Sequence, residues 1–76
     1  MNVWRVTYDS RFSSSSGSER YNIDHEDIDA LVLTMGDSLN DVEKAIKTGL
    51  DSQTQLMALK KAEWLGKAIG PERSGP

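Results

Sequence analysis

Residues 24 to 35 read DHEDIDALVLTM, and the interpretation of this stretch decides which fold class the sequence predicts. Its apolar side chains recur at i, i+3, i+4 and i+7, which is the spacing of one face of an α-helix. These side chains are Ile28, Leu31, Val32 and Met35. Asp24 is placed as an N-cap and Gly36 suits the position after a helix. We therefore expect a helix over about 25–35, with a strand over Leu31–Thr34 as the alternative.

Upstream of this stretch, the residues from Asn2 to Tyr8 predict a strand, because most of them are β-branched or aromatic. Alternate side chains in this strand share a face, and we expect Trp4 to be buried. Residues 9–19 are rich in serine, which offers no packing side chain, so a flexible loop is expected there. A second short strand over 20–24 would then complete a β-hairpin.

Downstream, a second helix is expected over about 38–49. Ser38 and Asp41 have the spacing of a capping box. The apolar stripe of this helix is formed by Leu39, Val42, Ile46 and Leu50. The segment 53–69 is ambiguous, because its Leu, Met, Ala and Lys content favours a helix whereas a thin hairpin sheet would gain from a third strand.

The predicted fold is thus a small single α+β domain over 1–69. A β-hairpin of about 2–8 and 20–24 packs against two helices of about 25–35 and 38–49. The segment 53–69 adds a third strand, a C-terminal helix or both, and part of 53–62 is expected to pair with the hairpin. A disordered tail is expected over 70–76.

Composition excludes several classes of protein. The chain has 76 residues, no cysteine and one histidine, so disulfides, thiolate zinc sites and multi-histidine metal sites are excluded within one chain. No apolar run approaches the roughly 20 residues of a membrane helix, and no signal peptide is evident. We therefore expect a cytoplasmic protein that does not bind membranes. A net charge of −3 makes nucleic acid an unfavourable partner.

The charges are unevenly distributed along the chain. Between Arg20 and Lys44 there are seven carboxylates and neither Lys nor Arg. They are Asp24, Glu26, Asp27, Asp29, Asp37, Asp41 and Glu43. Five of the seven would lie at the starts of the two expected helices, where acids complement the helix dipole. Together they predict an acidic helix surface that binds a basic protein partner.

No catalytic, cofactor or metal motif stands out, so we expect a non-enzymatic protein-interaction module without a cofactor. The layout is common among small accessory proteins of phages and mobile elements, and an inhibitor whose carboxylates mimic nucleic-acid phosphates is the most specific version. Two alternatives are a nucleic-acid contact and a structural homo-oligomer component, because a small core gains from a homodimer. The nucleic-acid contact would use Lys60, Lys61, Trp64 and Lys67.

Overall fold

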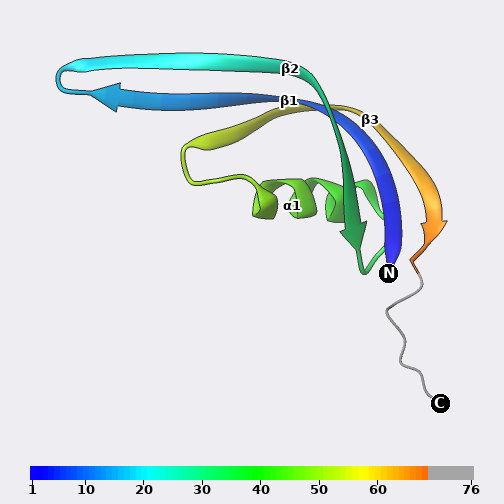
Figure 1. Ribbon diagram of the computed structural model, residues 1–76. Coiled ribbons are helices and arrows are strands. Elements are labelled where there is room, and N and C mark those ends of the chain that lie inside the picture. The colour runs from blue at the N-terminus through cyan, green and yellow to red at the C-terminus, as the bar shows by residue number, and fades with distance from the viewer. Residues whose placement is uncertain (69–76) are drawn as a thin grey trace.

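The computed structural model describes residues 1–68, which form a three-stranded antiparallel sheet with a helix on one side (Figure 1). The elements follow the order β1 (Asn2–Ser16), β2 (Glu19–Thr34), α1 (Leu39–Gly49) and β3 (Thr54–Lys67). In the sheet the order is β2-β1-β3, so the N-terminal strand is central and the other two strands form the edges.

The hairpin is much longer than the sequence predicted. β1 continues to Ser16 through the serine-rich stretch, so the flexible loop expected over 9–19 is wrong. The serines pair in register with β2, as in Ser14 opposite Tyr21. A tight turn at Gly17, whose φ of 63° suits glycine, reverses the chain. Serine has no packing side chain, but the paired backbone of a hairpin does not require one.

The helix expected over 25–35 is also wrong, because these residues belong to β2. Ile28 to Thr34 lie opposite Tyr8 to Asn2 of β1 without interruption. Each of these residues therefore gains an in-register partner on a strand that is itself β-branched and aromatic. The helical stripe in this stretch is a coincidence of a run that is apolar at nearly every position. The hairpin thus packs against one helix, not two.

The ambiguous segment 53–69 forms strand β3 over its described part, and no helix forms there up to Ala68. β3 pairs with β1 from Lys67 opposite Asn2 to Thr54 opposite Phe12. Register shifts occur at three places along this pairing, so β3 contains extra, bulged residues relative to β1. Strand pairing overrides the helical propensity of its Leu, Met, Ala and Lys residues.

The expected helix over 38–49 is confirmed as α1. Its N-cap is Ser38, whose Oγ accepts a hydrogen bond from the backbone N–H of Asp41 at 3.2 Å. α1 lies on the inner side of the bent sheet and buries its apolar face there (Figure 1). The buried core consists of Trp4, Val6, Tyr8, Val42 and Ile46.

Two expectations concern other parts of the chain. The tail expected over 70–76 lies outside the described residues. Within residues 1–68, α1 is too short and too polar to cross a membrane.

Candidate interaction surface

The face of the sheet opposite α1 is left open by the fold. Side chains alternate between the two faces, and Trp4, Val6 and Tyr8 of β1 point to the helix. Val3, Arg5 and Thr7 therefore point to the open face. Residues directly opposite in neighbouring strands share a face, so the register extends this set to β2 and β3. The added residues are Leu33, Leu31 and Asp29 on β2, and Glu63 and Lys61 on β3.

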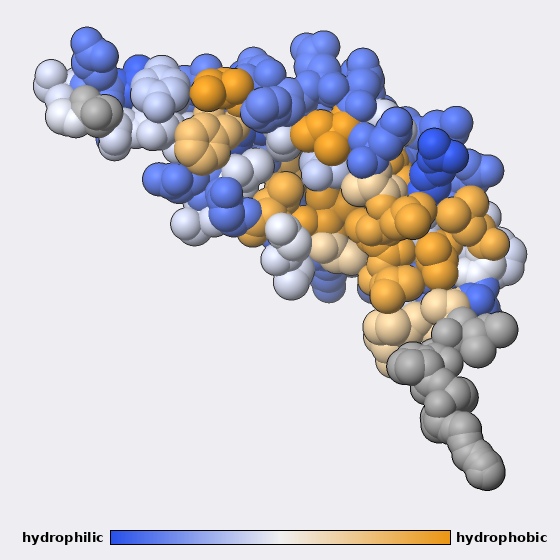
Figure 2. Space-filling model, viewed as in Figure 1, coloured by the Kyte–Doolittle hydropathy of each residue, from blue (hydrophilic) through white to orange (hydrophobic). Residues whose placement is uncertain are grey.

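Part of the open face is strongly apolar. Leu31 is 68% exposed, Leu33 51% and Leu65 50%. Leu65 lies at a register shift of β3, and it lines a shallow hollow together with Arg5 and Leu31. Figure 2 shows hydrophobic residues near the end of β2 and around α1, which covers the other face, whereas the far hairpin end is mostly hydrophilic. Exposed large side chains that lie together, such as Leu31, Leu33 and Leu65, are typical of an interaction site.

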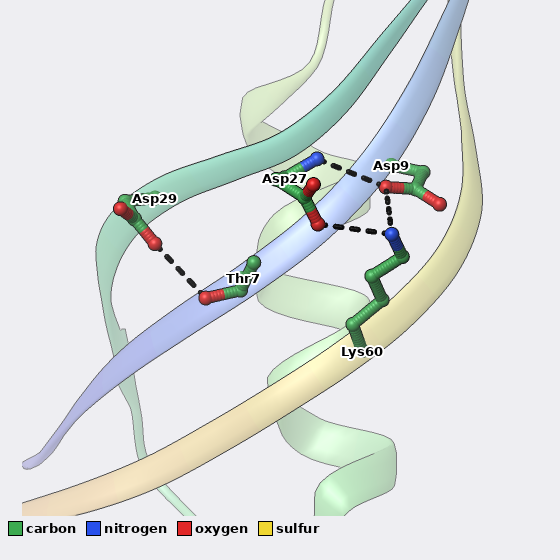
Figure 3. A network of polar contacts seen from close by, with 5 residues as sticks. All are labelled: Thr7, Asp9, Asp27, Asp29 and Lys60. Atoms are coloured by element: carbon green, nitrogen blue, oxygen red, sulfur yellow. Dashed lines mark hydrogen bonds and ion pairs between the residues drawn. The ribbon is translucent and has the colours of Figure 1, made fainter.

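Charges of both signs flank this apolar part. On the central strand Arg5 lies between Leu31 of β2 and Glu63 of β3. In the next open-face row Thr7 lies between Asp29 and Lys61. The Thr7 hydroxyl donates a hydrogen bond to Asp29 Oδ1 at 2.9 Å, which fixes this carboxylate (Figure 3). We call these residues the open-face patch: Val3, Arg5, Asp29, Leu31, Leu33, Lys61, Glu63 and Leu65.

The seven predicted acidic site residues do not form one helical surface. Asp24, Glu26, Asp27 and Asp29 lie on strand β2, so they cap no helix. Asp37 precedes α1, and Asp41 and Glu43 lie within it. At about 3.3 Å per strand residue, Asp24 lies roughly 30 Å along β2 from its end near Asp37.

Asp24 is already paired within the chain. Arg11, directly opposite it on β1, donates from Nε to Asp24 Oδ1 at 2.7 Å and from Nη2 to Oδ2 at 3.3 Å. The pKa of Asp24 is lowered from its usual value, mainly because its carboxylate accepts this hydrogen bond from Arg11. The pKa of Arg11 is raised for the same reason. This carboxylate is therefore partly neutralised before any partner arrives.

Asp27 occupies a β-bulge and is paired as well. Its φ of 56° is left-handed, and the β1–β2 register shifts here, between Tyr8 and Ser10. The backbone N–H of Asp27 donates to Asp9 Oδ1 at 3.0 Å (Figure 3). Lys60 of β3 reaches across β1, with its Nζ 2.9 Å from Asp27 Oδ1 and 3.4 Å from Asp9 Oδ1. The pKa of Lys60 is raised, mainly by the hydrogen bond to Asp27.

The second predicted contact, a basic patch with an aromatic residue, is also dispersed. Lys60 is held by the two aspartates, and Lys61 lies on the open face. Trp64 pairs with Trp4 and so lies on the helix face, where its Nε1 donates to Asn2 Oδ1 at 3.1 Å. Lys67 lines a hollow beside Trp64 at the end of the strands. Lys61 and Trp64 thus point to opposite faces of the sheet.

The apolar members of the open-face patch were missed as site residues by the sequence prediction. The available signal was the run Ala30-Leu31-Val32-Leu33, which is apolar at consecutive positions. In a strand such a run places apolar side chains on both faces, which is typical of a strand covered on both sides. Across residues 1–68 no group of three or more His, Asp or Glu side chains could hold a metal ion.

Comparisons of this chain with protein-family models, with curated proteins and with solved structures find no match.

Proposed function

We propose that this chain is a non-enzymatic protein-interaction module that binds through the open-face patch. The observation that carries the proposal is the exposure of Leu31, Leu33 and Leu65 on a sheet face that α1 does not cover. An apolar centre with charges around it is the usual arrangement of a protein interface. The partner surface is accordingly a protein surface with an apolar centre and charges of both signs at its rim.

This proposal replaces the acidic surface with a different one on the same molecule. Asp24 and Asp27 already hold cations of their own chain, and Asp29 accepts from Thr7. A surface mimicking phosphates would need its carboxylates free to meet a basic partner. The leucines of the open-face patch can meet a partner without first breaking contacts of this kind, because their side chains are already exposed.

Site-specific photocrosslinking in the organism that encodes the chain tests the proposal. A photoreactive amino acid replaces Leu31, and in a matched control it replaces Ile23, which is 43% exposed but lies opposite Phe12 near the far hairpin end. We expect a discrete protein adduct from position 31 and none from position 23. Adducts from position 23 alone, or from neither position, would contradict the proposal. An adduct with any protein, including a second copy of the chain, supports it.

A further inference from the structure

We infer that the outer edge of β2 binds an extended segment of another protein, which adds to the sheet as a fourth strand antiparallel to β2. The segment has apolar side chains at two alternate positions and a lysine or arginine two residues further on. This rests on the proposed function, because Leu31 and Leu33 of the open-face patch lie on β2, and it specifies the partner. Two observations carry it: the free backbone groups of the edge and the position of Asp29.

The edge of β2 is regular over residues 28–34. These residues lie opposite Tyr8 to Asn2 of β1 without a register shift, and the bulge at Asp27 ends the regular part. Because β2 is an edge strand, alternate residues direct their N–H and C=O groups away from the sheet. Within residues 1–68, no backbone hydrogen bond outside the strand pairing involves residues 28–34. An extended chain has the spacing that matches these free groups.

The side chains of this edge determine the pattern of the added strand. Ala30 and Val32 are half-buried towards α1, whereas Asp29, Leu31 and Leu33 are exposed on the open face. Residues directly opposite in neighbouring strands share a face, so two alternate residues of the added strand lie beside Leu33 and Leu31. Apolar side chains at these two positions remove the leucines from water. In an antiparallel strand the next residue on the same face lies beside Asp29.

Asp29 selects a cation at that position. Its Oδ1 accepts the hydrogen bond from the Thr7 hydroxyl, and within residues 1–68 its carboxylate forms no ion pair. Lys61 lies in the same row, but Thr7 of β1 separates the two residues. Neighbouring strands lie about 4.8 Å apart, so a cation on the added strand starts about 5 Å from Asp29 and Lys61 starts about 10 Å away. The added strand therefore offers the nearer partner charge.

The edges of a second copy do not supply this pattern. From residue 21 to residue 34, β2 contains four carboxylates and neither Lys nor Arg, so β2 placed against β2 brings no lysine or arginine to Asp29. β3 has the required spacing at Met57, Leu59 and Lys61. A register shift lies between the last two, because Leu59 pairs with Tyr8 on the helix face and Lys61 pairs with Thr7 on the open face. The complementary strand accordingly belongs to another protein.

Selection from a displayed library of random heptapeptides, with the full chain as bait, tests the side-chain pattern. We expect the enriched peptides to share two apolar residues at alternate positions, followed two residues later by Lys or Arg. Selection on Asp29→Lys should enrich Asp or Glu at that last position instead. Glu19→Lys is the matched control, because it makes the same change of charge on β2 at the exposed far hairpin end. This control should enrich the same peptides as the native chain.

Two N-methylated forms of one enriched peptide test the backbone pairing. In one form the methyl groups replace the amide hydrogens of alternate residues, and in the other form those of the residues between. Only one set of amides faces β2, so we expect one form to bind at least about tenfold more weakly and the other to stay within about twofold of the parent peptide. On the native chain, NMR chemical shifts of the amides should change at residues 28–34 when the peptide binds.

Circular dichroism controls for folding, since Asp29→Lys also removes the hydrogen bond from Thr7. Selection that enriches no peptide, or peptides without a cation at a fixed position, overturns the inference. Two methylated forms that bind equally well also overturn it, because the peptide would then lie on the sheet face. If position 31 still crosslinks to a protein, failure of the selection leaves the proposed function standing. If the heptapeptides bind as expected but neither position 31 nor position 23 gives an adduct, the proposed function alone is contradicted.

Discussion

At the residue scale, the ion pair of Asp24 and Arg11 shows how the fold uses the acidic segment. The two side chains are cross-strand partners, and the guanidinium contacts both carboxylate oxygens. Both groups are solvent-exposed to a large extent, with side-chain exposures of 55% for Asp24 and 38% for Arg11. Solvent therefore screens the pair, and its contribution to stability is small. Its pH dependence is nevertheless measurable.

Replacing Asp24 by Asn should remove a part of the stability that depends on pH. The folded pKa of Asp24 is lowered, so its contribution is complete above the ordinary carboxyl value of about 4 and is lost as pH falls through the lowered folded pKa. Urea denaturation of the native chain and of Asp24→Asn, over a series of pH values, measures the difference. We expect it to be constant near neutrality and to shrink in acid.

An Arg11→Gln background is the control for this prediction. Without the guanidinium, the main cause of the lowered Asp24 pKa is gone. In the Arg11→Gln background, Asp24→Asn should then change the pH dependence of the free energy of unfolding much less. If the difference in the free energy of unfolding between the native chain and Asp24→Asn stays the same down to strongly acidic pH, the lowered pKa of Asp24 is contradicted.

At the element scale, the bulge in β2 determines where the hairpin bends. Two residues of β2, Glu26 and Asp27, lie opposite Asp9 of β1, and the strands are in register on either side. Bulges bend a strand and increase its local twist. Asp27 takes the left-handed conformation that the bulge requires, and Lys60 and Asp9 hold it there.

Glycine at position 27 should be more stable than alanine. Both Asp27→Gly and Asp27→Ala remove the contact with Lys60. The difference between their free energies of unfolding therefore reports the cost of the left-handed backbone conformation at this position. Alanine is strained at a φ of 56° whereas glycine is not, and we expect Asp27→Gly to unfold with a free energy about 1 kcal/mol higher than Asp27→Ala. Urea denaturation of the two variants measures this difference in the free energy of unfolding.

The same pair of substitutions at Asp29 is the matched control, because Asp29 lies in the regular part of β2. There glycine should be the less stable variant, by about 0.5–1 kcal/mol, since it weakens a strand interior. The same order of stability at both positions would show that the bulge imposes no conformational demand at Asp27.

The elements also show what sequence patterns could predict. The capping residues Ser38 and Asp41, and the stripe of Val42 and Ile46, act within one local segment, so α1 was predicted close to its observed bounds. Of β2 only the strand over 20–24 was predicted, with a strand over Leu31–Thr34 as the alternative to the helix. The apolar run of β2 fits both the helical and the strand periodicity, and only pairing with β1 decides between the two. β3 has the composition of a helix, and the same non-local pairing overrides it.

At the scale of the whole molecule, the structure is elongated, with extents of 59 × 26 × 17 Å. The elongation comes from the end of the hairpin, residues 13–22, which we call the hairpin arm. β3 starts at Thr54, opposite Phe12, and therefore supports β1 only up to the base of the arm. Beyond that point the arm is a two-stranded ribbon without a core (Figure 1). An isolated two-stranded hairpin is marginally stable in water.

The hairpin arm should therefore open independently of the rest. Amide hydrogen exchange of the native chain measures this residue by residue. We expect the amides of the arm, such as those of Ser14 and Tyr21, to exchange through local opening with a free energy at least about 2 kcal/mol below that of Val6 and Tyr8. Val6 and Tyr8 lie in the buried core and should exchange only by global unfolding. Equal protection in the arm and the core would contradict this division.

The open-face patch is formed by residues from all three strands, so it exists only in the whole folded molecule and could not be predicted from local sequence patterns. Lys61 and Asp29 are far apart in sequence and become neighbours of Thr7 only through the order β2-β1-β3. The exposure of Leu31 depends on the helix covering the other face. By contrast, the seven carboxylates are close in sequence, and the fold distributes them over β2, its connection to α1 and α1 itself.

The three register shifts along β3 have a consequence for the chain at high concentration. A regular edge strand offers evenly spaced N–H and C=O groups on which another copy can add as a new strand, and repeated addition leads to fibrils. Three bulges break this spacing on the β3 edge, and the carboxylates from Asp24 to Asp29 lie along the β2 edge. The β3 edge and the part of the β2 edge up to Asp29 are therefore poor templates for polymerisation, whereas β2 is regular and apolar from Ala30 to Leu33. Edge-to-edge addition of another copy is thereby confined to the short stretch of β2 from Ala30 to Thr34.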